Sequence, residues 1–470
     1  MKKRVRLCMK DLFHQDVVEM IERETRRYQI WSIEDPSDPD FDAAYQILWD
    51  SFGPHGEMER KEAIEAFLRD DPYTPEPSGT YMRYFLLVAR DSDGRVRGVR
   101  DGTVLVNPAY APDLCVLYLA HIFMIPEARG TVLSYWLRIA PVELAMQYLA
   151  DLHAMGKITL PAPAAPGKYF GMNMDLAAEV EFFTPEERLS WQRILFYGRG
   201  GFDAINPRHF PYRQPDFRDP EEIRATGNQP SPFMVLVRRM GRERQAQLPI
   251  DEARALMRLL YDDFADHCAP HLLENSLQLV LDRLEERAKR KSFVELLPLP
   301  TGPRDLHRLK PLFRYNVYTK YYPDSPDIRG YLNSGIRERL ANPRYLDEEL
   351  ARIARELETR PPFVYGSRDK SATWEGTPVT PGSEPPPPEG TDAGEITREL
   401  PVTPSAATAA TPSSTATAAT PSSTATAATP PSTATAATPP STATTATPPS
   451  AATTATPPPA ATPPSTATSR

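Results

Sequence analysis

"DLCVLYLAHIFMIPEARG", residues 113–130, is the stretch of sequence that decides the fold. Its first part, 113–125, is apolar on both faces, which is typical of a central strand in a sheet. After Arg129 and Gly130 a helical pattern extends to about Met155. A strand that leads into a helix leaves the first helical amides without intrahelical partners, and these amides and the helix dipole favour an anion. This corner is therefore the first candidate for a binding site.

The elements before this corner alternate between strand and helix patterns. An alternating strand at 27–35 is followed by helical patterns at 41–52 and 59–70. Strand-like runs at 82–90 and 96–106 then flank the turn sequence "DSDG". Because turn residues separate two strand-like runs, this pair predicts an antiparallel hairpin.

The elements after the corner continue the same mixture. A further strand is expected within 167–183, followed by a helix that begins with Thr184 as its N-cap. Two more strands are expected, one within 204–217 and the other at 232–239. The fold class is therefore α/β (α+β).

This order of elements resembles the GNAT superfamily of acyl-CoA N-acyltransferases. Two motifs carry the resemblance: "IFMIPEARG" at 122–130, and "FYGRGGF" at 196–202, where a Tyr is followed four residues later by Gly-Phe. The likeness covers approximately residues 27–240. It implies a central mixed, mostly antiparallel sheet flanked by helices. It also implies direct transfer of an acetyl group from acetyl-CoA, the co-substrate, to an amine in a ternary complex.

The resemblance assigns the cofactor to the corner described above. The family pattern there is Arg or Gln, two residues, Gly, one residue, then Gly or Ala, but Val132 and Ser134 stand at the two small positions. The implied cofactor-binding residues are Met124, Ile125, Arg129, Gly130, Thr131, Val132, Leu133 and Ser134. Two interpretations stay open. Either the amides of the corner still hold coenzyme A, or Arg129 is a surface residue and Val132 belongs to the core.

The catalytic candidates come partly from the resemblance and partly from the residues themselves. Tyr197 matches the family's general acid, although a tyrosine that only packs would give the same pattern. The base has three candidates: Glu179 and Glu181, which alternate on one face of a strand, and His121. Apolar neighbours of His121 would lower its pKa and keep it neutral. Each of the three also has a purely structural explanation.

Composition narrows the class of protein. The formal net charge of -8 gives no support for nucleic-acid binding. Cys8, Cys115 and Cys268 have no paired spacing, which favours a reducing compartment, and we expect Cys115 to be buried and inert. The histidines lack metal-ligand spacing, so no metal is expected. No apolar run is long enough to span a membrane and no signal segment is recognised, so we expect a cytoplasmic protein.

The chain is expected to divide into four parts. An N-terminal helical segment (1–26) precedes the GNAT-like domain (27–245), and a helical C-terminal extension (246–370) follows it. Residues 371–470 form a Thr/Ala/Pro-rich, low-complexity tail, which is expected to be disordered because it has too few apolar groups to fold. The sequence leaves open whether the extension covers the acceptor or mediates a homodimer.

The sequence thus predicts an N-acyltransferase that acts on an amine-bearing acceptor, either a small molecule or a protein. The alternative is a catalytically inactive GNAT-like scaffold that binds other proteins. An open cleft lined by Arg129 and Tyr197 would favour the enzyme, whereas Val132 in the phosphate position would favour the scaffold.

Overall fold

A computed structural model describes residues 2–5, 15–24, 27–129, 131–160, 172–218, 220–265, 268, 270–325, 328, 330 and 332–359. The expected tail (371–470) and residues 360–370 lie outside this described part. The expected class, an α+β fold with a mixed, mostly antiparallel sheet and helices on both faces, is confirmed.

The described residues contain one large sheet, whose strand order is β1-β2-β3-β4-β5-β7-β11-β8-β13-β12. Strand β6 pairs with β4 beside this path, and β5 with β7 is its parallel pair. The strands are β1 (Lys2–Arg4), β2 (Tyr28–Ile33), β3 (Tyr81–Asp91), β4 (Val96–Val106), β5 (Leu114–Tyr118), β6 (Ile122–Met124), β7 (Asn173–Val180), β8 (Asp203–Ile205), β11 (Met234–Arg239), β12 (Gln247–Pro249) and β13 (Phe293–Pro298). Strands β9 (Arg213–Gln214) and β10 (Ser231–Pro232) form a separate small sheet.

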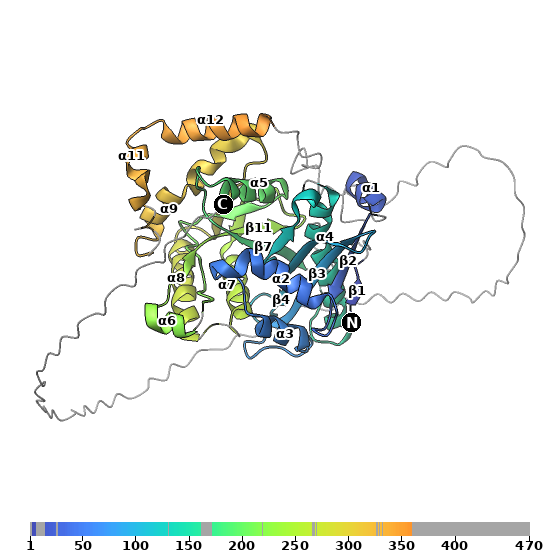
Figure 1. The fold of residues 1–470 in the computed structure, drawn as a ribbon. Coiled ribbons are helices and arrows are strands. Elements are labelled where there is room, and N and C mark those ends of the chain that lie inside the picture. Colours follow the sequence, from blue (N-terminus) through green and yellow to red (C-terminus); the bar gives the residue numbers. More distant parts are fainter. Residues whose placement is uncertain are drawn as a thin grey trace, which may run out of the picture. The chain divides into compact units, whose positions relative to one another are not determined.

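Helices cover both faces of the sheet (Figure 1). Successive residues of a strand point to opposite faces, so Phe85 and Leu87 of β3 share a core with one set of helices and Leu86 and Val88 with another. The first face carries α1 (Gln15–Glu24), α4 (Val132–Ala154), α5 (Arg188–Arg199), α9 (Arg314–Tyr321) and α12 (Tyr345–Glu358). The second carries α2 (Phe41–Phe52), α3 (Lys61–Arg69), α7 (Ile250–Asp263) and α8 (Pro270–Ala288).

The short helices lie in the connections. They are the 3₁₀ turns η2 (Gly53–His55), η3 (Pro126–Ala128) and η4 (Pro303–Leu312), the α-helices α6 (Pro220–Thr226) and α11 (Arg337–Leu340), and the π turn η5 (Leu332–Ile336). One expected boundary is wrong: α5 begins at Arg188 rather than just after Thr184. Residues 184–187 instead form a turn in which the Glu187 amide donates to the Thr184 carbonyl at 3.2 Å.

Strands β5 and β7 separate beyond Tyr118, and this separation creates the space for a site. Their pairing ends at Tyr118 opposite Ala177, and the Leu119 amide makes a last bond to the Ala177 carbonyl at 2.8 Å. Beyond that point the chain turns away from β7 and β6 pairs with β4 instead. Gly102 of β4 lies at this break. A Cβ there would be 2.1 Å from the Tyr118 carbonyl oxygen, and φ is +153°, so glycine is required.

The region after residue 245 builds into the same body. Strand β13 pairs with β8 and β12 pairs with β13, so this region contributes strands to the main sheet as well as the expected helices. Leu350 and Ile353 of α12 belong to the same hydrophobic core as α4 and α5. The N-terminal segment likewise contains β1, paired with β2, in addition to the expected helix. Figure 1 shows α12 above α5.

Candidate active site

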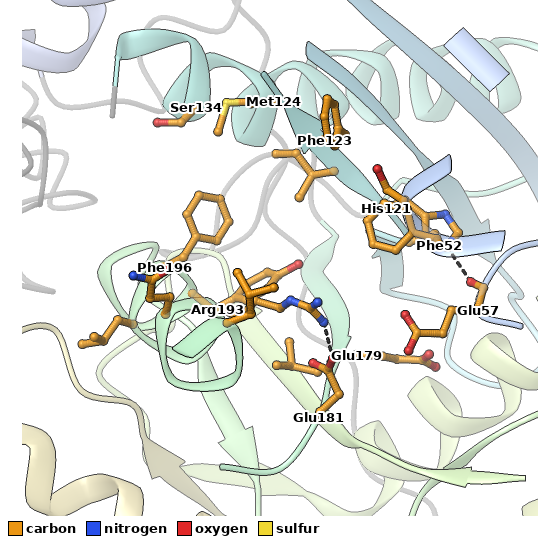
Figure 2. Close-up of a pocket in the computed structure, with 18 of the residues that line it drawn as sticks. Phe52, Glu57, His121, Phe123, Met124, Ser134, Glu179, Glu181, Arg193 and Phe196 are labelled. Atoms are coloured by element: carbon orange, nitrogen blue, oxygen red, sulfur yellow. Dashed lines mark hydrogen bonds and ion pairs between the residues drawn. The ribbon is translucent and has the colours of Figure 1, made fainter. Parts of the chain in front are cut away.

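A cavity of about 840 Å³ occupies the space where β5 and β7 separate. Its walls come from β6, the end of β7 with Glu181 just after it, the beginning of α4, and α5. Ser51 and Phe52 of α2 lie at one side, and Leu357 of α12 contributes from the C-terminal region. Figure 2 shows Phe52, Phe123, Glu179 and Phe196 around this cavity.

The corner between β6 and α4 lies open to this cavity. Met124, Arg129 and Ser134 line it, whereas Val132 is 1% exposed and packs in the core. Leu133 is also buried in that core. Ile125 and Thr131 are half-buried outside the lining, and Gly130 lies outside the described residues. Of the two features that would separate enzyme from scaffold, the one present is the open cleft lined by Arg129 and Tyr197.

The amides of this corner already make local hydrogen bonds. The Thr131 amide donates to the Ala128 carbonyl at 3.3 Å, and the Ser134 amide donates to the Thr131 carbonyl at 3.2 Å. Thr131 is the N-cap of α4, and its hydroxyl accepts from the Leu133 amide at 3.3 Å. These bonds are long for N–H···O contacts. An anion bound here would therefore replace weak local bonds.

Arginine side chains surround the half of the cavity next to α4 and α5. The lining includes Arg129, Arg138, Arg188, Arg193 and Arg199. Arg138 lies between the rings of Tyr135 and Phe196, at 4.9 and 4.7 Å from their centres. Burial lowers the pKa of Arg138 to about 10, which leaves it charged at neutral pH. This half of the cavity is therefore suited to an anionic ligand.

Tyr197 of α5 lines the same half. It is 6% exposed, and its ring packs edge-on against Phe196 and Phe202. Burial raises the pKa of its hydroxyl, while the positive charges of Arg100 and Arg193 act in the opposite direction. Its hydroxyl therefore carries a proton at neutral pH and can donate it.

Glu179 lines the cavity from the end of β7. Burial raises the pKa of its carboxyl to about 7, against the opposing effect of hydrogen bonds from Tyr212 and Tyr118. The Tyr212 hydroxyl donates to Oε1. A carboxylate with a pKa near 7 can both accept and release a proton at neutral pH.

Glu181 also lines the cavity, but its surroundings differ from those of Glu179. Its Oε1 pairs with Nη1 of Arg193, as Figure 2 shows. The two glutamates therefore face the same cavity, and one of them is already neutralised by a cation.

His121 differs from our expectation, because its pKa is raised rather than lowered. Burial disfavours the charged imidazolium, but the carboxylates of Asp101 and Glu59 outweigh it and raise the pKa to about 9. Nδ1 lies 3.0 Å from Asp101 Oδ1, and Nε2 lies 2.7 Å from the Glu57 carbonyl oxygen. Both ring nitrogens therefore donate, and His121 lines the cavity as a cation rather than as a base.

Carboxylates gather on the side of the cavity away from the arginines. A smaller cavity of about 40 Å³ shares Tyr118 and Ala120 with the main one. Its acidic lining residues are Glu59, Asp70, Asp71, Glu76, Asp101 and Asp263. Burial raises the pKa of Asp263 to about 8 and also raises that of Glu59. The sequence did not predict these residues because they come from separate loops, from strand β4 and from helix α7, and no local pattern connects them.

Three further observations concern the described part of the chain. No cluster of three or more His, Cys, Asp or Glu among the described residues is arranged to hold a metal ion. Cys115 is fully buried, and burial raises the pKa of its thiol. None of the described helices has the length and apolar character needed to cross a membrane.

Among the comparisons with known proteins, only the search of solved structures found similar proteins. No family model matches the sequence, and no curated protein matches it. The chain is similar to a spermidine N-acetyltransferase from Vibrio cholerae, solved with CoA and spermine, at 10% identity and a TM-score of 0.26; the match covers 47% of this chain and 99% of that one. A protein assigned as a phosphinothricin N-acetyltransferase is 14% identical with a TM-score of 0.23, covering 45% of this chain and 98% of that one.

A third neighbour is a protein assigned as an acyl-CoA N-acyltransferase from Klebsiella pneumoniae. It is 14% identical, with a TM-score of 0.21, and the match covers 45% of this chain and 97% of that one. The chain therefore has structural neighbours among GNAT N-acetyltransferases over slightly less than half of its length.

Proposed function

We propose that the protein is an N-acyltransferase that moves an acetyl group from acetyl-CoA to an amine. One observation carries this proposal: a protonated tyrosine, Tyr197, and a carboxyl with a pKa of about 7, Glu179, line the same cavity. Acyl transfer from a thioester to an amine requires such a pair, because one proton must leave the amine and another must reach the departing sulfur.

Each residue has a defined part in the step. The Glu179 carboxylate accepts a proton from the amine nitrogen as that nitrogen bonds to the thioester carbon. The Tyr197 hydroxyl donates its proton to the sulfur as the carbon–sulfur bond breaks. Exchange with water then restores both groups. Cys115 is fully buried, so its thiol is not accessible as a nucleophile for an acyl-enzyme.

Acetyl-CoA supplies the activated acyl group in this reaction. The arginine-lined half of the cavity, with Arg129 and Arg138, suits its phosphates and would hold the cofactor. Main-chain amides from Thr131 to Ser134 would contribute after exchanging their long local bonds. Val132 does not obstruct this arrangement, because its side chain packs in the core.

The amine acceptor would enter on the opposite, acidic side. Glu57 and Glu179 line the main cavity there, and the smaller acidic cavity adjoins it. A protonated amine is attracted to such a wall. It loses its first proton to water, and Glu179 accepts the second as the nitrogen bonds to the thioester carbon.

The second candidate function is a scaffold that binds other proteins without coenzyme A. The hydrogen bonds that already engage the amides of Thr131, Leu133 and Ser134 favour this alternative, since a retained cofactor corner more usually keeps its donors open.

Calorimetric titration of acetyl-CoA into the full chain tests the proposal. We expect a Kd in the micromolar range, and release of free thiol when amines are then added. Arg97→Met is a matched control for handling and folding, because Arg97 pairs with Asp91 away from the cavity. Binding without thiol release from any amine would favour the scaffold, and absence of binding would exclude the enzyme.

A further inference from the structure

Arg100 of β4 is a buried, charged residue that has no role in the proposed reaction described above. It is 0% exposed, and its Nε, Nη1 and Nη2 atoms have no hydrogen-bond partner of standard geometry in the described structure. Burying a guanidinium without a compensating partner destabilises a fold. A residue that imposes such a cost on the fold requires an explanation.

Arg100 lies opposite Leu87 of β3, and Leu87 and Tyr197 belong to the same core. The Arg100 guanidinium and the Tyr197 hydroxyl are close enough to interact electrostatically. Burial lowers the pKa of Arg100, and interaction with Tyr197 is the largest influence acting in the other direction, ahead of Asp101. Asp101 follows Arg100 in the strand and therefore points to the opposite face, where it binds His121. On the face of Arg100, Tyr197 is therefore the group that interacts most strongly with it.

The direction of this interaction follows from the chemistry of the two groups. A guanidinium has only donors, so it can interact only with a lone pair of the Tyr197 oxygen. The hydroxyl hydrogen must then point elsewhere, and Tyr197 lines the cavity. The positive charge also stabilises the phenolate that remains after the proton is given away.

We propose that Arg100 is a positioning residue: it turns the hydroxyl hydrogen of Tyr197 toward the cavity and stabilises the phenolate formed by proton donation. The role rests on the proposed function, in which Tyr197 is the acid. Arg100 itself does not line the cavity and need not touch either reactant.

Two other cations face Tyr197, but each has another partner. Arg193, from α5, pairs with Glu181. Arg138, from α4, donates from Nε to the Ser134 carbonyl at 3.2 Å and stacks against two aromatic rings. Because these two are held elsewhere, the effect on Tyr197 should be largest when Arg100 is replaced.

Titration of Tyr197 in the full chain provides a readout that does not need activity. The protein is labelled with 3-fluorotyrosine, and the ¹⁹F signal of Tyr197 is assigned by its loss in Tyr197→Phe. In Arg100→Met we expect the Tyr197 pKa to rise by about one to three units, the usual effect of removing an adjacent opposite charge. Arg97→Met, in the same strand but paired with Asp91, should leave the signal unchanged.

Turnover provides the second readout. We expect kcat in Arg100→Met to fall about tenfold, with the alkaline limb of the pH profile moved upward and acetyl-CoA affinity retained. Arg100→Lys should restore part of the rate because it restores the charge. In a Tyr197→Phe background, Arg100→Met should not lower kcat further, because the hydroxyl on which Arg100 acts is absent.

The outcomes separate this proposal from the proposed function. An unchanged Tyr197 titration in Arg100→Met overturns the role of Arg100, whatever the activity. If the Tyr197 titration shifts but the parent protein transfers no acetyl group, the proposed N-acyltransferase function is wrong instead. If Arg100→Met does not fold, as judged by circular dichroism, Arg100→Gln is the second neutral variant, and the same two results decide.

Discussion

Burial has opposite effects on the charge of the two sides of the cavity at neutral pH. On the side of α4 and α5, burial lowers the pKa of Arg138 only to about 10, so the arginine stays charged at pH 7. On the side of β7, burial raises the pKa of Glu179 to about 7, and in the adjoining smaller cavity it raises that of Asp263 to about 8. The same loss of water therefore leaves one side permanently cationic and makes the other titratable near neutrality.

This difference assigns separate tasks to the two sides. A fixed positive charge can hold an anion at any physiological pH, but it cannot exchange protons. The carboxyl side can exchange protons, but its attraction for a cation varies with pH. In the proposed reaction, binding of the donor and proton removal from the acceptor would therefore take place at different walls of the cavity.

The largest predicted effect is on Glu179. We expect Glu179→Gln to lower kcat by about 10²–10⁴-fold, because the amide cannot accept a proton. In the parent protein, activity should fall as the pH drops below about 7, where the carboxyl becomes protonated, and the variant should lose this limb. Steady-state pH profiles measure both effects.

Glu181→Gln is the matched comparison, because Glu181 lines the same cavity but is paired with Arg193. Its effect on kcat should be less than tenfold. A larger loss of kcat in Glu181→Gln than in Glu179→Gln would show that Glu181 is the base, and the two glutamates would then have the opposite roles.

The second prediction concerns His121 and the stability of the acidic side. Its folded pKa of about 9 is above the ordinary value of 6.5, so its contribution is fully present below about pH 6.5 and is lost as the pH rises through 9. His121→Gln should therefore destabilise the protein more at pH 6 than at pH 10, by up to about 3 kcal/mol. Urea unfolding at the two pH values measures the difference.

His209→Gln serves as the control for this pH dependence. Burial and Arg287 lower the pKa of His209, so its loss should not destabilise the protein preferentially at low pH. Equal destabilisation of His121→Gln at both pH values would mean that His121 is neutral in the fold.

A third, smaller effect should separate the two walls directly. Arg138→Gln should weaken acetyl-CoA binding about tenfold and leave the KM for the amine unchanged, while Glu57→Gln should do the reverse. Calorimetry gives the first quantity and initial rates give the second. If both variants change the binding of the same reactant, the charges of the two walls do not determine where each reactant binds.

The smallest predicted effect is on Val132. Val132→Gly should leave the affinity for acetyl-CoA within about twofold, because the side chain lies in the core and not in the cavity. It should lower the Tm, since it removes buried methyl groups and adds a glycine to the helix. Tighter binding in the variant, measured by the same titration, would show that the valine crowds the cofactor.

Although the short α6, β9 and β10 were missed, most elements from β2 to β11 could be predicted from the sequence because they have local signals. The hairpin β3–β4 and the apolar run that becomes β5 and β6 are of this kind. Strand β13 was missed because it is short and includes Glu295, and its partner β8 lies far back in the sequence. The start of α5 was misplaced because Thr184 and Pro185 resemble a helix cap but form a turn.

Tyr197 and Glu179, which a motif and an alternation mark in the sequence, both line the cavity, and their roles stay predictions. The pKa of His121 was predicted with the wrong sign because its partner Asp101 lies in the neighbouring strand, where no local pattern reveals the pairing. Arg100 did leave a signal that could have been used. It is a charged residue between Gly98 and Gly102, on the strand face that then continues with Val104.

The position of Leu357 has a consequence for how the protein is made. Strand β8 pairs with β13, and Leu357 lines the cavity, so both the edge of the sheet and one wall of the site come from late parts of the chain. During synthesis, β7 and α5 emerge well before the segments that complete them. A chain released early would expose apolar surface around an unfinished cavity, and premature termination should therefore yield aggregation rather than a partly active enzyme.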